Sequence, residues 1–468
     1  MATPPMATVL AAQRADFLRQ GATTPARRKA DLLGLRQAVL ARRQEFAAAL
    51  DADFGHRSAY ETTIMEIVPL LHGIDYLRRN LRQWMRPERR RVALPFRPGS
   101  ARVAYQPLGV VGIMSPWNYP LTLSLMPLAT AIAAGNRVML KPSEFTPATT
   151  ALLTSMLREI FPEQQVAVVT GGAEVGAAFA ALPFDHLVFT GSTNVGRSVM
   201  RAASENLVPV TLELGGKSPA IIQPGLPLER PAASIAYGKL ANAGQTCIAP
   251  DYALVHEDDV ASFVTYYSDA VRKLYPAGSS DPAYASIINA QHYQRLRALL
   301  EDARSKGARI IEIDSPELPD ARRERTLAPT LVLDATADMA VSQNEIFGPI
   351  LAITPYRDLD DAIAYVNARP RPLALYLFAG DSRVRRQVLE CTTSGNVTIN
   401  DTLLHFAQDD LPFGGVGASG MGAYHGKEGF MALSHAKGIF EQARWSATAL
   451  LRSPFGRITD MLLAYLLR

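Results

Sequence analysis

The stretch ELGGKSPAIIQPGLPLERPAASIAYGKLANAGQTC runs from Glu213 to Cys247 and contains a candidate base and a candidate nucleophile. Glu213 ends an apolar, β-branched run that starts at Val208, and two glycines follow it directly. We expect the glycines to leave this carboxylate at a strand end with little steric cover, where it can address a bound substrate. Cys247 follows Gly-Gln-Thr, and the glycine lets the backbone approach a thiolate nucleophile closely. The stretch therefore predicts a strand that ends in a base and a later turn that carries a reactive cysteine.

Apolar strands alternate with helical segments from Gly109 onward. The first five predicted strands are Val110–Met114, Arg137–Leu140, Val166–Val169, His186–Phe189 and Val208–Leu214. Their starts lie 27, 29, 20 and 22 residues apart, which fits helical crossovers and therefore a parallel, doubly wound sheet. A second, less regular α/β unit follows, with predicted strands at Pro219–Ile222, Tyr252–His256, Arg309–Ile313, Ile350–Pro355, Leu373–Phe378 and Asn396–Asn400. Polar residues at the carboxyl ends of such strands are expected to form the functional site.

Two long helices are predicted before these strands. The first starts with the Thr24-Pro25 cap and runs to about residue 50, and the second starts with a capping box at Ser58 and runs to about Met85. Short extended pieces at Arg102–Tyr105 and Lys437–Gln442 lie outside the main sheets and are expected to pair with each other. The fold class is therefore α/β with a small β excursion.

The composition is typical of a globular protein. The 468 residues suffice for about three domains, and 48% hydrophobic with 20% charged residues argues against a disordered chain or a membrane bundle. The net charge of the chain is +4, and its excess of positive charge is concentrated in residues 78–102, which carry nine arginines against one glutamate. We expect a solvated helix face or a subunit contact there, and no binding of nucleic acid, because no aromatic platform accompanies the arginines.

The cysteine content predicts a reducing, cytoplasmic location. Two cysteines are too few for a disulfide framework, and the N-terminal sequence lacks the basic and apolar regions of a secretory signal. Cys391 has no glycine beside it and is expected to be a packing residue. An isolated cysteine is most often a small buried hydrophobic residue, so Cys247 alone would also indicate packing. Its combination with Glu213 favours catalysis instead.

The combination of ELGGKSP with GQTC resembles the signature segments of the aldehyde dehydrogenase superfamily. The segments GQTCIAPDY and PFGGVGASGMGAYHGK resemble its shorter class 3 branch, which includes fatty, aromatic and bacterial coniferyl aldehyde dehydrogenases. The resemblance implies NAD-dependent oxidation of an aldehyde to a carboxylic acid through a cysteine thioester. It also implies that Cys247 is the nucleophile, that Glu213 is the general base, and that Asn118 forms the oxyanion hole with the cysteine N–H. From the residues alone, Asn118 could equally satisfy its own proline-bracketed turn.

Further residues carry a cofactor role only through this resemblance. In KPSE, Lys141 and Glu144 would bind the adenosine ribose, and the carboxylate would disfavour a 2′-phosphate and thus favour NAD, with NADP as the alternative. In GSTNVG, Gly191, Ser192 and Gly196 would line the phosphates at the start of a helix. Without the resemblance, KPSE could be an exposed salt-bridged turn and GSTNVG an ordinary strand-to-helix turn.

In EIFGP, the resemblance assigns Glu345 to the nicotinamide ribose and Phe347 to the nicotinamide face, against an alternative of strand-edge packing. No metal-ligand spacing is present, and His405 and His425 are expected to be hydrogen-bonded structural residues. Four aromatic residues are candidates for a substrate tunnel or for the core: Trp117, Tyr119, Phe406 and Phe413.

The resemblance also implies a domain organisation. A Rossmann-type NAD-binding domain would comprise residues 1–87 and 107–214, and an α/β catalytic domain would comprise 215–412. An oligomerisation excursion at 88–106 and 436–448 would form a homodimer, and 449–468 would be a C-terminal tail. Pro454 and three charges interrupt this tail, so we do not expect it to span a membrane.

Two alternatives to this reaction stay open. A cysteine hydrolase or acyltransferase would leave KPSE, FTGSTNVG and EIFGP unexplained, and a non-catalytic scaffold would be expected to lose Cys247, Glu213 or Asn118. A CoA-acylating dehydrogenase is a closer alternative, but a retained general base favours water as the acyl acceptor. The aldehyde itself, aromatic or cinnamyl versus medium- or long-chain aliphatic, is left open by the sequence.

Overall fold

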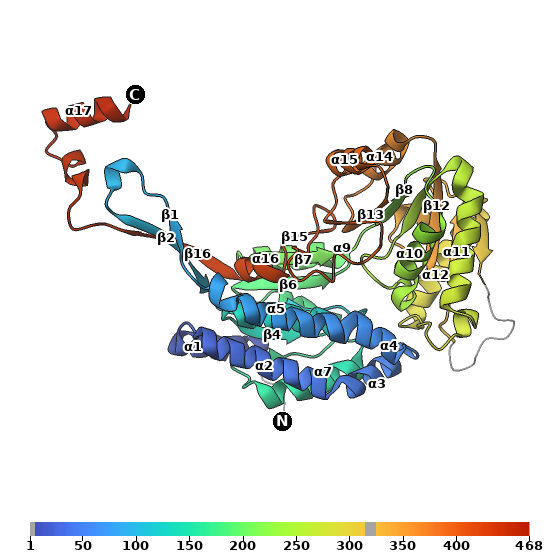
Figure 1. Cartoon of the computed structure of the whole chain (residues 1–468). Helices are drawn as coiled ribbons and strands as arrows, with labels where there is room; N and C mark the ends of the chain where they lie inside the picture. Colours follow the sequence, from blue (N-terminus) through green and yellow to red (C-terminus); the bar gives the residue numbers. More distant parts are fainter. Residues whose placement is uncertain (1–4, 314–323, 468) are drawn as a thin grey trace.

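The computed structural model describes residues 5–313 and 324–467, which form two large sheets with flanking helices and a three-stranded arm (Figure 1). The predicted α/β class is confirmed. The parts of the predicted domains at residues 1–4, 314–323 and 468 lie outside the described residues.

The first sheet is the predicted doubly wound sheet. Its strand order is β15-β7-β6-β3-β4-β5, and every pairing is parallel except that of the edge strand β15. The strands are β3 (Val110–Met114), β4 (Arg137–Lys141), β5 (Val166–Val168), β6 (His186–Gly191), β7 (Val210–Leu214) and β15 (Gly420–Met421). The crossover helices are α6 (Thr122–Ala134), α7 (Pro147–Ile160), α8 (Ala173–Ala180) and α9 (Thr193–Ser204). All five strands predicted in this region are therefore confirmed, with small shifts at their ends.

The N-terminal helices differ from the prediction of two. The structure has α1 (Met6–Gln20), α2 (Pro25–Ala41), α3 (Arg43–Phe54), α4 (Ala59–Thr62), a π-helical turn η1 (Thr63–Ile67) and α5 (Val68–Trp84). The predicted first helix is broken at Arg42, whose φ of −98° and ψ of 14° are not helical. Helix α1 was missed because its buried face includes the polar Gln13 and Asp16, which weakens the apolar periodicity.

The second sheet has the strand order β10-β11-β12-β9-β8-β13-β14. Its strands are β8 (Pro219–Ile222), β9 (Tyr252–His256), β10 (Arg309–Glu312), β11 (Thr330–Leu333), β12 (Ile350–Tyr356), β13 (Ala374–Phe378) and β14 (Asn396–Ile399). The six predicted strands are confirmed. Strand β11 was missed because a threonine followed by three apolar residues carries no clear period. Its helices are α10 (Glu229–Leu240), α11 (Val260–Leu274), α12 (Ala290–Ser305), α13 (Ala340–Gln343), α14 (Leu359–Asn367) and α15 (Ser382–Cys391).

The arm consists of β1 (Glu88–Arg90), β2 (Ser100–Pro107) and β16 (Ser434–Glu441), which follows α16 (Gly426–Ala432). Lys437 pairs with Ala104 in an antiparallel register, so the predicted pairing of these distant segments is confirmed. Figure 1 shows that the arm extends away from both sheets and that the last helix, α17 (Arg457–Leu466), lies at its far end. No helix within the described ranges is long and apolar enough to cross a bilayer.

Candidate active site

Cys247 lies in a turn after α10 where the backbone is unusually constrained. The preceding 3₁₀ turn η3 (Ala241–Gly244) contains Asn242 and Ala243 with φ of 53° and 50°, in the left-handed region that L-residues rarely occupy. Gly244 has φ of 75°, and an added Cβ would collide with the main-chain carbonyl of Gly348. Gly244 thus packs closely against the segment of Gly348, and only glycine permits this approach.

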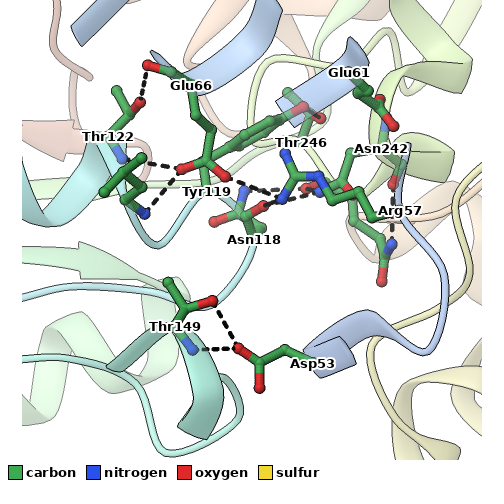
Figure 2. A network of polar contacts seen from close by, with 12 residues as sticks. Asp53, Arg57, Glu61, Glu66, Asn118, Tyr119, Thr122, Thr149, Asn242 and Thr246 are labelled. Carbon is green, nitrogen blue, oxygen red and sulfur yellow. Dashed lines mark hydrogen bonds and ion pairs between the residues drawn. The ribbon is translucent and has the colours of Figure 1, made fainter. Parts of the chain in front are cut away.

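Asn118 lies directly beside this turn. Its side-chain Nδ2 donates a hydrogen bond of 3.0 Å to the carbonyl of Gln245, two residues before the cysteine. The hydroxyls of Tyr119 and Thr246 are 2.7 Å apart and form a second link between the same two segments. Both links join the loop after β3 to the cysteine turn, as Figure 2 shows. The orientation of the Asn118 amide is thus set by the nucleophile's own segment rather than by its local turn.

Glu213 is the penultimate residue of β7 and is buried, with 3% of its surface exposed. The expectation of a carboxylate with little steric cover is therefore wrong, because the glycine-rich segment that contains Gly414 and leads into β15 packs against the carboxylate. An added Cβ on Gly414 would lie 3.3 Å from Oε1. Neither carboxylate oxygen has a hydrogen-bond partner among residues 5–313 and 324–467. Burial raises the pKa of Glu213 well above its usual range, which favours the uncharged form.

Cys247 and Glu213 line the same cavity, which has a volume of about 50 Å³. Most of the other lining residues are apolar, including the predicted tunnel residues Tyr119, Phe406 and Phe413. Trp117 is not part of this lining and instead lies edge-on to Phe347, with ring centroids 5.4 Å apart. A second cavity of about 150 Å³ shares Thr122 and Phe406 with the first. The two cavities are thus neighbours separated by these side chains.

The cysteine thiol is in an environment that opposes ionisation. Burial raises the pKa of Cys247 to about 12, and the nearby carboxyl groups of Glu345 and Glu213 act in the same direction. At neutral pH the ligand-free site therefore holds a neutral thiol, with a carboxyl group favoured in its uncharged form on the opposite wall. A change in the local charge is needed before the thiol can act as a nucleophile.

The predicted cofactor residues of the first sheet lie at the carboxyl ends of their strands. Lys141 ends β4, and its Nζ donates to Glu144 at 2.8 Å. Gly191 ends β6, Ser192 caps α9, and Gly196 follows in the first turns of that helix. An added Cβ on Gly196 would lie 2.6 Å from the Leu214 side chain, so glycine is needed for α9 to pack this close to β7.

Glu345 and Phe347 approach the same region from the second sheet. The Glu345 carboxylate occupies the space that a Cβ on Gly215 would need. Burial raises the pKa of Glu345 to about 7, and the charge of Asp251 adds to this effect. Phe347 has φ of 50°, a strained conformation for a bulky residue. The EIFGP and ELGG segments are more than a hundred residues apart in the sequence. The structure thus brings them next to each other.

A protein-family model matches most of the chain. The model of the Aldehyde dehydrogenase family matches residues 6–439. The chain belongs to the aldehyde dehydrogenase family. It is thus an oxidoreductase that acts on an aldehyde group, and the resemblance of its motifs to that family is confirmed.

Individual relatives of this aldehyde dehydrogenase match over nearly their whole length. A protein of Pseudomonas aeruginosa named "Probable coniferyl aldehyde dehydrogenase" is 53% identical, over 96% of this chain and 93% of its own length. The substrate-bound structure of Staphylococcus aureus AldH superposes with a TM-score of 0.93 at 38% identity, covering 99% of this chain and all of that one. A Mycobacterium tuberculosis aldehyde dehydrogenase solved in complex with NAD⁺ superposes with a TM-score of 0.84 at 30% identity, over 93% and 89% of the two chains.

A salt bridge and a set of arginine-to-carbonyl hydrogen bonds hold the EIFGP segment in this aldehyde dehydrogenase, and sequence reasoning missed both. Lys217 pairs with Asp251, whose second carboxylate oxygen accepts the main-chain N–H of Ile346 at 2.8 Å. Arg295 on α12 donates to the carbonyls of Glu345 and Ile346. Lys217 and Asp251 flank the two signature motifs, so their positions were a usable signal. Arg295 gives no such signal, because a single arginine on an amphipathic helix is typical of a solvated face.

Two expectations outside the cavity change, those for His425 and Cys391. Nδ1 of His405 bonds the Thr398 hydroxyl at 2.7 Å, but Nε2 of both His405 and His425 lacks a partner in the part of the chain that the structure describes. Burial lowers the pKa of each to about 4, so both are neutral and only His405 is hydrogen-bonded as expected. Cys391 is exposed, and its assignment as a packing residue was wrong. The described residues contain no cluster of acidic, histidine or cysteine side chains that could hold a metal.

Proposed function

We propose that this enzyme oxidises an aldehyde with Cys247 as nucleophile, Asn118 as oxyanion donor and Glu213 as general base. The observation that carries the proposal is that Cys247 and Glu213 line one cavity while Asn118 is bonded to the cysteine turn. A nucleophile and a base that share one small volume, with a preorganised donor bonded to the nucleophile's turn, are the components that acyl-transfer chemistry requires.

In the proposed reaction, the Cys247 sulfur forms a bond to the aldehyde carbon while the thiol proton passes to a water molecule. The carbonyl oxygen becomes an oxyanion, which the Asn118 amide and the Cys247 main-chain N–H stabilise. Loss of the hydride leaves an acyl group joined to Cys247 as a thioester. Glu213 then takes a proton from water, the resulting hydroxide attacks the thioester, and the acid leaves while the thiol is restored.

The residues present fit NAD as the hydride acceptor. The N-terminal N–H groups of α9, a helix of 12 residues capped by Ser192, favour a bound phosphate. The hydroxyl of Thr190 at the end of β6 is buried with no partner within residues 5–313 and 324–467, so a ligand group can satisfy it. Lys141 and Glu144 would hold the adenosine ribose, and Glu345 and Phe347 the nicotinamide end. When bound, NAD supplies the hydride acceptor and a positive charge near the thiol.

We propose an aromatic, cinnamyl-type aldehyde such as coniferyl aldehyde as the substrate. The Pseudomonas aeruginosa relative carries this substrate in its name, and Phe406, Phe413 and Tyr424 give the cavity an aromatic wall. The aldehyde would lie in the cavity of Cys247, with the ring directed toward the second cavity beyond Phe406. Medium- and long-chain aliphatic aldehydes are the second candidate, because Met65 and Leu123 also line the cavity.

The test is an NADH-release screen over short, long-chain, benzylic and cinnamyl aldehydes, with and without added coenzyme A. We expect the highest kcat/KM with cinnamyl aldehydes and no dependence on coenzyme A. Faster turnover with long aliphatic aldehydes would replace the proposed substrate by the second candidate. Turnover only with coenzyme A would overturn the role of water as acyl acceptor. Cys247→Ala is the blank, because it lacks the nucleophile.

We also propose the domain boundaries stated from the sequence, a homodimer and a cytoplasmic location. The edge strand β16 has no neighbour on its outer side within the described sheet, and Phe440 and Trp445 beside it are exposed. Such an edge is suited to a second copy of the chain. The mass in solution from light scattering tests this proposal: a monomer that persists at high protein concentration would contradict it. Two unpaired cysteines support a reducing compartment.

A further inference from the structure

A buried charged cluster lies behind Asn118, on the side away from the cavity. It comprises Arg57, Glu61 and Glu66, and we call it the Arg57 cluster (Figure 2). The side chains of Arg57 and Glu66 are fully buried and their charged groups lie 3.1 Å apart. None of the three residues lines the cavity that holds Cys247. The reaction as proposed above does not use them.

Arg57 contacts Asn118 directly. Its Nη1 donates to the main-chain carbonyl of Asn118 at 3.0 Å. The guanidinium lies over the rings of Phe54 and Tyr119, at 4.9 Å from each centroid. A planar guanidinium that is stacked on rings and hydrogen-bonded at its edge has little freedom to rotate. The position of the Asn118 main chain is therefore set by a rigid group.

Glu66 holds the other end of the same loop. One of its carboxylate oxygens accepts the N–H groups of Leu121 and Thr122, at 2.8 and 3.0 Å. These are the first N–H groups of α6, so Glu66 caps that helix. Glu66 itself lies in the π-helical turn η1, a local feature that often marks functional positions. Arg57 and Glu66 together fix both ends of the Asn118 loop.

The cluster also reaches the cysteine turn. Glu61 accepts the main-chain N–H of Asn242, which lies in the left-handed part of that turn. The Asn242 amide donates to the carbonyl of Asn118 at 3.0 Å, so this carbonyl receives hydrogen bonds from both Arg57 and Asn242. One buried cluster thus holds the oxyanion donor and the strained turn that leads to the nucleophile (Figure 2).

We propose that Arg57 is a positioning residue that aims the Asn118 amide at the substrate oxygen. Buried charges are a poor means of stabilising a fold, because apolar replacements often do as well. Two guanidinium nitrogens of Arg57 have no partner among the described residues, so the cluster is not optimised for stability either. The cluster instead fixes the position of the Asn118 side chain. One N–H of the Asn118 amide donates to the carbonyl of Gln245, and the other is left for the oxyanion.

The inference rests on the proposed role of Asn118 and is tested with Arg57→Met. A displacement of about 1 Å in a catalytic group can cost about 100-fold in rate, so we expect kcat for NADH formation to fall about 10- to 100-fold. The KM for NAD should stay within about twofold, because Arg57 contacts Asn118 and Glu66 but none of the proposed cofactor residues. Arg57→Lys should recover part of kcat, since its Nζ can serve both Glu66 and the Asn118 carbonyl.

The matched control is Arg137→Met. Arg137 also forms a buried salt bridge, at 2.8 Å to Asp16, but at the opposite end of β4 from Lys141. Loss of this pair should lower the thermal unfolding temperature, as loss of Arg57 does, without lowering kcat. If Arg137→Met lowered kcat as much as Arg57→Met at equal loss of stability, the effect of Arg57 would be structural and the inference would be overturned.

A double-mutant cycle with Asn118→Ala gives the decisive readout. If Arg57 acts through Asn118, Arg57→Met should change kcat by less than about twofold once Asn118 is Ala, because interacting sites are not additive. A full multiplication of the two effects would overturn the inference. The unfolding temperature should still fall in the double variant, which separates positioning from stability.

Asn242→Gly provides a second cycle that does not depend on the folding of Arg57→Met. Glycine keeps the left-handed backbone at this position and removes only the amide that donates to the Asn118 carbonyl. We expect a drop of about threefold to tenfold in kcat that disappears in the Asn118→Ala background. The wild-type enzyme distinguishes failure of the proposed function from failure of the positioning role. Absence of NADH formation with every aldehyde would refute the proposed function. Normal wild-type turnover, together with multiplicative effects of the two substitutions on kcat, would refute the positioning role alone.

Discussion

The two walls of the Cys247 cavity are built in opposite ways. On one wall, Thr246 and the cysteine turn are hydrogen-bonded to the loop of Asn118 and Tyr119, which the Arg57 cluster holds in turn. Asn118 itself lies behind this wall and is not among the residues that line the cavity. On the other wall, the carboxyl group of Glu213 is buried against the segment of Gly414, and neither of its oxygens has a hydrogen-bond partner in the described ranges. Hydrogen bonds therefore fix the side chains of the first wall, whereas only packing contacts hold the carboxyl group of the second wall.

This difference matches two different tasks. An oxyanion donor must be in place before charge develops, because reorganisation during the reaction would raise the barrier. A base must instead change its protonation state, and a carboxyl group without fixed hydrogen bonds can move or gain a charge when its surroundings change. Burial keeps the pKa of Glu213 high until then. The contrast predicts that substitutions on the two walls affect different steps.

The largest expected effect is that of Cys247→Ala, which removes the group that both walls serve. We expect no measurable aldehyde-dependent NADH formation, because no covalent adduct can form. Binding of NAD, measured by calorimetry, should be unchanged, since the cofactor residues are separate from the thiol. Substantial NADH formation by this variant would exclude the covalent route.

The next prediction concerns the charge state of the thiol. Because burial raises the pKa of Cys247 to about 12, the thiolate fraction should rise about tenfold with each pH unit in the neutral to alkaline range. The rate of alkylation by iodoacetamide in the ligand-free enzyme should therefore rise about 1000-fold from about pH 7 to about pH 10. Cys391→Ser is the required background, since Cys391 is exposed and would react as well. A plateau near neutral pH would show that the thiol is already activated without ligands.

Asn118→Ala tests the hydrogen-bonded wall. We expect a loss of about 10²- to 10³-fold in kcat, the range typical of removing one oxyanion donor. Comparison with Asn118→Asp, which keeps the size but replaces the N–H donors by a carboxylate, separates the donor from its volume. A loss confined to KM would mean that Asn118 only binds the substrate.

The smallest effect is expected at the ribose end, where Lys141 and Glu144 form a salt bridge. Glu144→Gln removes the charge that opposes a 2′-phosphate and should raise the ratio of kcat/KM for NADP over NAD by about tenfold or less. Lys141 keeps its place in this variant, so both cofactors can still bind. An unchanged ratio would show that Glu144 does not face the ribose.

The strands and the motif residues could be predicted from the sequence for a physical reason. Strands buried on both faces, such as Val110–Met114, are continuous apolar runs bounded by glycine and proline, and residues at their carboxyl ends meet at one edge of the sheet. The position of Glu213 at a strand end follows from this pattern. Its burial does not, because β15 comes from a segment about 200 residues later in the chain.

The Arg57 cluster could not be predicted, and neither could α1. Arg57, Glu61 and Glu66 are single charged residues around a capping box, where a solvated helix start is the ordinary interpretation. Only their tertiary contacts with the loop that precedes α6 and with the cysteine turn bury them. Helix α1 uses Gln13 to bond the carbonyl of Val138 and Asp16 to bond Arg137, and such polar burial is invisible to a search for apolar periods.

The most direct test of the account is a rapid-mixing measurement on Glu213→Gln, because it separates the tasks of the two walls. Glutamine keeps the shape of the side chain and removes the base. We predict a burst of up to one equivalent of NADH per active site, followed by turnover reduced about 10²- to 10⁴-fold, with an acyl adduct on Cys247 visible in the intact mass. Steady turnover at the wild-type rate with no adduct would contradict the assignment of Glu213 as the base, and with it the division of labour between the two walls.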